Sequence, residues 1–116
     1  LVTGDAPKAR EFFRANFVPY YATPVYNNFL AWSGFEAEAA EIAAGWAARD
    51  RDRTGRALSD EVVDEIAIIG TAEECRDRIR AYADGGITTH IIACPSSNPA
   101  DLERTFEAFT ADNFHF

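Results

Sequence analysis

The chain has 116 residues, 47% of them hydrophobic, and carries a net charge of −8 at pH 7. This length suits one domain and is too short for two. No run approaches the ~18 consecutive apolar residues of a membrane span. The acidic balance argues against the clustered positive charge that a nucleic-acid surface needs. We therefore expect neither a membrane nor a nucleic acid as a partner.

The sequence contains no Met and begins at Leu1. Because translation starts with Met, we expect the chain to be a piece of something longer; the alternative is that only a short N-terminal piece was trimmed. No basic stretch followed by an apolar run opens the chain, so no secretory signal is visible. Cys75 and Cys94 are too few for a disulfide scaffold, and we interpret both as small buried hydrophobes in a reducing cytoplasm.

The first half of the chain predicts three helices after a possible strand end at residues 1–4. The first begins near Pro7 and ends near Pro19, because apolar residues recur there at helical spacing. The second begins at Thr23-Pro24 and carries an apolar face of Val25, Phe29 and Trp32. The third covers residues 35–49, which are chiefly the strong helix formers Ala and Glu. Residues 49–56 alternate in charge and predict a solvated loop.

The second half predicts a helix that begins at Ser59 and is ended by Gly70. A capping box of Thr71 and Glu74 opens the next helix, which ends at the Gly85-Gly86 pair. A strand at residues 88–94 follows, and Asn98-Pro99 opens the last helix. Residues 112–116 are predicted to be a frayed tail.

The predicted strand at residues 88–94 cannot stand alone. Its consecutive apolar residues 91–93 are typical of a parallel strand that is covered on both faces. Such a strand needs neighbours for its N–H and C=O groups, and the remaining segments are helical. We therefore expect a mostly helical chain whose missing sheet belongs to the rest of a larger α/β domain or to a second copy of the chain, and we expect a homo-oligomer.

The same segments resemble a known family. The resemblance covers most of residues 9–109, and its motifs are helix caps and strand edges rather than catalytic signatures. The chain is similar to the C-terminal end of the bacterial-luciferase-like oxidoreductases, and within them to the coenzyme F420-dependent reductases such as methylenetetrahydromethanopterin reductase. The residues that carry the resemblance are Leu58-Ser59-Asp60-Glu61-Val62-Val63-Asp64-Glu65-Ile66-Ala67-Ile68-Ile69-Gly70-Thr71-Ala72-Glu73-Glu74-Cys75, Arg78-Ile79-Arg80-Ala81-Tyr82, Gly85-Gly86-Ile87 and Ile91-Ile92-Ala93-Cys94-Pro95.

The resemblance implies a (β/α)8 TIM barrel of the α/β class, of which residues 1–116 would be the C-terminal portion. Residues 1–4 would end the seventh strand, and residues 88–94 would form the eighth. Residues 18–70 would be a helical excursion on the catalytic face, and residues 71–110 the last helix-strand-helix unit.

The resemblance also implies an activity. A small-molecule substrate would undergo hydride transfer or monooxygenation with F420 or FMN, because the cofactor carries the redox step in such enzymes. The main cofactor contacts and the catalytic residues would lie on earlier strands, upstream of Leu1. An isolated piece of this length would then be inactive.

Two groups of residues are candidates for the rim of a substrate pocket. Tyr20, Tyr21, Tyr26 and Asn27 flank the predicted helix break at Pro24, where a phenol could donate a hydrogen bond to a ligand. Packing between helices is the alternative for them. Ser96, Ser97 and Asn98 follow the predicted strand at a helix N-terminus suited to an anion, and simple turn and cap chemistry is the alternative there.

The other polar residues predict no site. His90 lies within the predicted strand and is interpreted as a core or interface histidine, and His115 lies in the tail. The two histidines and the two cysteines do not have the spacing of zinc ligands, so no metal site is expected. A second hypothesis remains open, in which the chain is a non-catalytic helical module for interaction or dimerisation, with its aromatic residues lining a partner surface.

Overall fold

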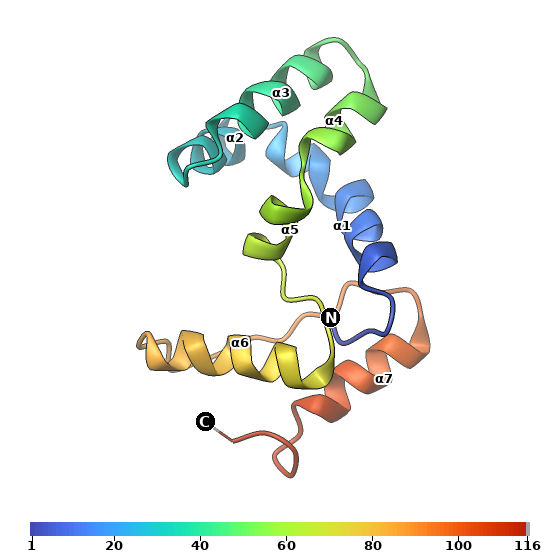
Figure 1. Ribbon diagram of the computed structural model, residues 1–116, viewed down its shortest axis with the longest axis vertical. Helices are drawn as coiled ribbons and strands as arrows, with labels where there is room; N and C mark the ends of the chain where they lie inside the picture. The colour runs from blue at the N-terminus through green and yellow to red at the C-terminus, as the bar shows by residue number, and fades with distance from the viewer. Residues whose placement is uncertain (116) are drawn as a thin grey trace. The chain divides into compact units, whose positions relative to one another are not determined.

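A computed structural model describes residues 1–115, and Figure 1 shows the order of their elements. Within these residues the regular elements are all helices: α1 (Ala6–Tyr21), α2 (Pro24–Trp32), α3 (Glu36–Ala47), α4 (Arg51–Ala57), α5 (Asp60–Ile66), α6 (Ala72–Asp84) and α7 (Pro99–Ala108). The chain divides into two compact units. We call Arg10–Ile66 the middle unit, and Leu1–Ala9 with Ala67–Phe116 the terminal unit.

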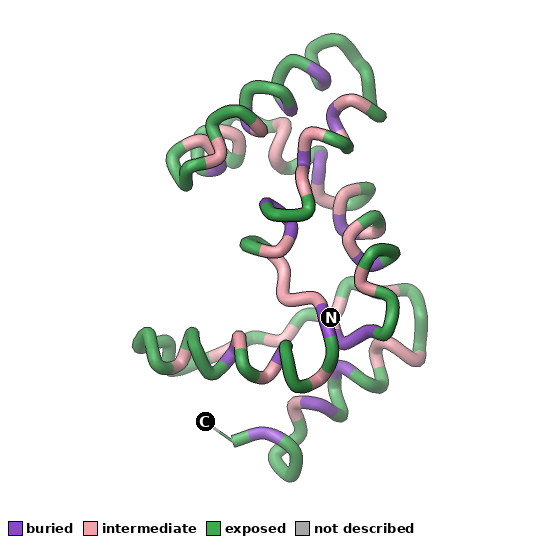
Figure 2. Tube along the Cα trace, viewed as in Figure 1, coloured by how far each residue is buried: buried purple, intermediate pink, exposed green. Residues whose placement is uncertain are grey.

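The middle unit is organised by α3, which packs against both α2 and α4. Leu30, Ala39 and Ile42 are buried there, and Thr54 of α4 has no exposed surface. Figure 2 colours the buried positions of these helices purple. Gly45 of α3 permits a close approach, because a Cβ at this position would lie 2.7 Å from Thr54 Oγ1 and 3.0 Å from Thr54 N. The absence of a side chain at Gly45 therefore sets how closely α4 lies against α3.

Two arginines of α1 fasten that helix to residues 58–64 within the middle unit. Arg10 makes a two-pronged ion pair with Asp64, with Nε to Oδ1 and Nη2 to Oδ2 both 2.8 Å. Arg14 Nε donates to the carbonyl oxygen of Leu58 at 2.6 Å, and its Nη2 pairs with Asp60. Paired N–H···O contacts of this kind fix geometry more strongly than a single ion pair does.

The terminal unit is held by one isolated parallel bridge between Val2 and Gly70. Thr3 N donates to Gly70 O at 2.9 Å, and Gly70 N donates to Leu1 O at 3.2 Å. Val2 N donates instead to the buried Thr105 Oγ1 of α7, also at 2.9 Å. Val2 then packs with Cys75 of α6 and Ala108 of α7 in a small apolar core.

The strand predicted at residues 88–94 is wrong for this structure, which contains no named strand among residues 1–115. Residues 87–96 lie outside regular secondary structure, and the side chain of Ile91 is 92% exposed. The physical reason is that no other segment of the described chain lies alongside as a strand to pair with these N–H and C=O groups. The strand end predicted at residues 1–4 is reduced to the bridge at Val2.

The loop predicted at residues 49–56 is also wrong, because α4 begins at Arg51. Asp50 caps this helix by accepting a hydrogen bond from Arg53 N at 2.9 Å. Arg53 pairs with Glu41 of α3 through two contacts, of 2.6 Å and 2.8 Å. The alternating charges thus belong to a cap and to a link between helices rather than to a solvated linker.

Several helix boundaries also differ from prediction. The first helix continues through Pro19 to Tyr21. The helix predicted to reach Gly70 ends at Ile66, because the backbone of Gly70 takes part in the bridge with the N-terminal segment. The capping box of Thr71 and Glu74 is confirmed, as is the start of the last helix at Pro99.

The frayed tail predicted at residues 112–116 is wrong at Phe114, which is 9% exposed. Its ring packs edge-to-face on Phe109 with centroids 5.2 Å apart. The guanidinium of Arg80 lies 5.2 Å from the same ring. Phe116 lies outside the described residues.

We expect Gly45→Ala to destabilise the protein by about 1–3 kcal/mol, since the new methyl group overlaps the backbone and side chain of Thr54. The measurement is the free energy of unfolding in urea. Gly55→Ala is the matched control, because a Cβ at Gly55 meets nothing within 4 Å, and it should instead add about 0.5–1 kcal/mol. Equal effects of the two variants would contradict the close approach of α3 and α4.

Glu74 predicts a pH dependence of stability. Hydrogen bonds from the backbone N–H and then the hydroxyl of Thr71 lower the pKa of Glu74 from its ordinary value of 4.5. A lowered folded-state pKa contributes stability above the unfolded-state pKa, and this contribution is lost as pH falls through the folded-state pKa. The melting temperature of Glu74→Gln should therefore approach that of the wild type as pH falls from 7 toward about 3.

The matched control for this experiment is Glu73→Gln, which removes a carboxylate from the same first turn but leaves the capping box intact. Its melting temperature should follow the acid dependence of the wild type. A difference between Glu74→Gln and wild type that stays constant with pH would contradict the assigned role of the Glu74 carboxylate.

Candidate functional site

Tyr20, Tyr21 and Tyr26 form an aromatic cluster where α1 gives way to α2. The ring of Tyr26 meets Tyr20 at 6.1 Å and 86° between planes, and Tyr21 at 6.3 Å and 70°. Edge-to-face contacts at these distances are favourable for aromatic pairs. The structure therefore brings the three predicted tyrosines together within the middle unit.

Asn27 holds the helix break beside this cluster. Its Nδ2 donates to Tyr21 O at 3.1 Å and to Ala39 O at 2.8 Å. Both amide hydrogens are thus used to tie the end of α1 and the start of α2 to α3. Asn27 acts in this structure as a clamp between helices and has no donor left for a ligand.

The phenols of the cluster differ in exposure. Tyr20 and Tyr26 are 54% and 49% exposed, whereas Tyr21 is only partly exposed. Burial, and then the neighbouring Tyr26, raises the pKa of Tyr21. Tyr21 therefore remains a protonated hydrogen-bond donor at neutral pH, and Tyr20 and Tyr26 present phenol groups to the outside.

The apolar face predicted for the second helix points outward rather than into a core. Val25, Phe29 and Trp32 are 76%, 58% and 82% exposed, and only Leu30 of α2 is buried. These three residues are spaced at i, i+4 and i+7, so they share one side of α2. The helix also contains no charged residue. Together with the tyrosine cluster, this side of α2 is an exposed aromatic surface of the middle unit.

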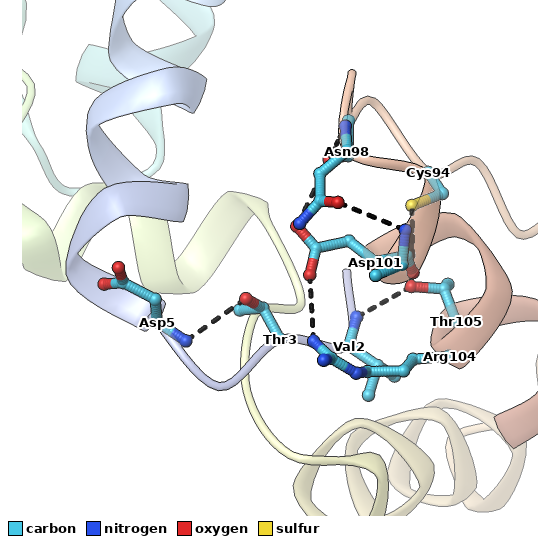
Figure 3. A network of polar contacts seen from close by, with 10 residues as sticks. Val2, Thr3, Asp5, Cys94, Asn98, Asp101, Arg104 and Thr105 are labelled. Atoms are coloured by element: carbon cyan, nitrogen blue, oxygen red, sulfur yellow. Dashed lines mark hydrogen bonds and ion pairs between the residues drawn. The ribbon is translucent and has the colours of Figure 1, made fainter.

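The second predicted group lies at the N-terminus of α7, where Figure 3 shows Asn98 beside Asp101, and its contacts are those of a turn and a helix cap. Asn98 Oδ1 accepts a hydrogen bond from Ala100 N at 3.1 Å. Ser96 Oγ accepts from Asn98 N at 3.1 Å and donates to Asp101 Oδ2 at 3.3 Å. The Asp101 carboxylate already supplies negative charge to this helix start, which disfavours a further anion. Ser97 is exposed.

Thr105 is a buried polar residue that the sequence did not single out. Its Oγ1 accepts the hydrogen bond from Val2 N and lies 3.5 Å from Cys94 Sγ (Figure 3). Its position on the amphipathic helix, four residues after Asp101 and three after Leu102, is its only signal in the sequence. This contact makes Thr105 a structural residue of the terminal unit.

The two cysteines differ in burial: Cys75 is buried as predicted, whereas Cys94 is only half-buried. Cys75 and Cys94 are free thiols, and burial raises the pKa of the Cys75 thiol. No group of three or more His, Cys, Asp or Glu side chains is arranged to hold a metal ion within residues 1–115. No helix in this part of the chain is long and apolar enough to cross a membrane.

Comparison with known proteins identifies the family of the chain. The model of the luciferase-like monooxygenase family matches residues 3–89. This match spans well over half of the sequence, and the chain therefore belongs to the luciferase-like family. No curated protein and no solved structure gives a significant match.

Proposed function

We propose that this chain is the C-terminal part of a luciferase-like oxidoreductase that acts on a small organic molecule with F420 or FMN, and that within the family it is similar to the F420-dependent reductases such as methylenetetrahydromethanopterin reductase. The observation that carries the proposal is the family match over residues 3–89. Members of this family fold as TIM barrels, which need about 250 residues. We place the whole protein in the cytoplasm, consistent with the two free thiols. We also expect the whole protein to be a homo-oligomer.

The fold supports this placement in two ways. Residues 10–66 form a compact unit of their own, as a helical excursion from a barrel would. This unit overlaps most of the proposed excursion at residues 18–70. Residues 71–110 would be the last unit of the barrel, because a strand-type sequence at 88–94 lies between α6 and α7 and has no partner strand among the described residues.

The start of α7, where Ser96, Ser97 and Asn98 are the predicted candidates for an anion, does not fit the phosphate of a flavin or deazaflavin. The best-placed helix start, that of α7, is occupied by Ser96 and Asn98 contacts and carries the Asp101 carboxylate. We therefore assign the cofactor contacts and the catalytic groups to residues outside this chain. The expected role of Tyr20, Tyr21 and Tyr26 is to pack against a substrate and exclude water from it, with Asn27 fixing the helix break.

The test is an absorbance titration with FMN and with F420 of the full-length protein whose sequence contains this chain, and of the 116-residue chain alone. We expect the full-length protein to bind one of the two cofactors and the chain alone to bind neither. A full-length protein that binds neither cofactor overturns the proposal. Cofactor binding by the chain alone would contradict the assignment of the contacts to other residues.

A second function is favoured by the exposed side of α2. The chain would then be a non-catalytic module that associates with itself through Val25, Phe29 and Trp32, since large exposed apolar surfaces mark interaction sites. Light scattering over a concentration series would show self-association of the chain. Trp32→Gln should lower the affinity of this self-association by about tenfold. Phe106→Gln is the control, because Phe106 is 56% exposed on α7. A monomer at all concentrations rejects this function.

A further inference from the structure

The junction of α3 and α4 has an unusual residue at the position that ends α3. Arg49 has a φ of +56° and is the one non-glycine residue with positive φ among residues 1–115. Its N–H donates to Trp46 O at 3.0 Å, and Asp50 N donates to Gly45 O at 2.9 Å. This pair of bonds is the Schellman motif, in which glycine is the usual residue at the left-handed position. An arginine there is less favourable than glycine.

A hollow of about 410 Å³ lies at this junction, lined by Trp46, Ala47, Arg49, Arg51 and Thr54. Its volume is within the range of small-molecule sites. The indole of Trp46 is 41% exposed, so one aromatic face or edge is accessible. Thr54 Oγ1 donates to Asp50 O at 2.6 Å and is already engaged. The other aromatic or polar residues that line this hollow are Trp46, Arg49 and Arg51.

The charge of the hollow is unlike that of the protein as a whole. The chain has a net charge of −8, yet none of the residues lining this hollow is acidic. Asp50 faces its own helix start and accepts from Arg53 N, and the nearby Arg53 is paired with Glu41. Neither Arg49 nor Arg51 forms an ion pair with any of the residues that the structure describes.

We propose that this hollow binds a single-ring aromatic ligand that carries a carboxylate or phosphate group, with Trp46 against the ring and Arg49 and Arg51 on the anion. Arg49, with its left-handed backbone, is one of the residues that line the hollow. Guanidinium groups suit such anions because they donate paired hydrogen bonds. The site lies wholly within the middle unit and is independent of the redox function proposed above.

The test uses phenyl phosphate as the probe and the fluorescence of Trp46 as the readout. The chain has two tryptophans, so the measurements are made in a Trp32→Phe background, in which Trp46 is the only indole. We expect saturable quenching by phenyl phosphate that weakens as salt is raised. Inorganic phosphate and benzyl alcohol, tested in competition, should each bind at least tenfold more weakly than the complete probe, because each lacks half of the recognised chemistry.

Two variants separate binding from folding. Arg51→Gln should lower the affinity for phenyl phosphate by about tenfold. Arg49→Gly should weaken the binding of phenyl phosphate to a similar degree and yet raise the melting temperature, because glycine adopts the left-handed conformation without a steric penalty. Arg56→Gln is the matched control: Arg56 is an exposed arginine of α4 outside this hollow, and its loss should leave binding unchanged.

The absence of saturable quenching by phenyl phosphate overturns the proposal. So does an Arg49→Gly variant that is more stable and binds as tightly as the wild type, since the arginine would then have no ligand role. Equal weakening by Arg56→Gln would show a general charge effect and would also reject the site. None of these outcomes depends on whether the full-length protein binds FMN or F420.

Discussion

The constraint on which the terminal unit depends is that backbone groups in extended segments need a partner strand. An α-helix pairs its own N–H and C=O groups, whereas a strand pairs them only with a neighbour. Among residues 1–115, the seven named helices form within single stretches of sequence, but extended pairing is limited to the bridge between Val2 and Gly70. The hydroxyl of Thr105 then accepts the hydrogen bond of Val2 N. A side chain of α7 thus replaces what a second strand would supply.

The sequence predicts elements well where local chemistry decides them. The Thr71 and Glu74 capping box and the Asn98-Pro99 helix start are local signals, and both are confirmed. The strand at residues 88–94 depends on neighbours, and its local sequence therefore could not determine it. The apolar side of α2 was read correctly as a stripe, but periodicity does not tell whether a stripe faces a core or the outside.

The junction of α3 and α4 shows why the sequence of residues 49–56 predicts a loop where the structure has a helix. An ordinary helix end carries glycine at the left-handed position, and here the position holds Arg49. The glycine of this junction lies four residues earlier, at Gly45, where it allows Thr54 to approach. Asp50, as the cap of α4, could have been recognised from sequence, because Asp is a favoured N-cap residue. The clustering of Tyr20, Tyr21 and Tyr26 has a local cause, since a proline-marked helix break gathers the side chains on either side of it.

Residues 87–94 have a consequence for the chain in concentrated solution. They contain no Asp, Glu, Lys or Arg and are rich in Ile and Thr, and Ile91 is almost fully exposed. Short uncharged segments of high β-propensity template the stacking of chains into cross-β fibrils when they are left uncovered. Pro95 at the end of this segment interrupts such stacking, because it lacks the N–H that continued pairing requires. Whatever covers this segment therefore also protects the polypeptide from self-assembly into insoluble material.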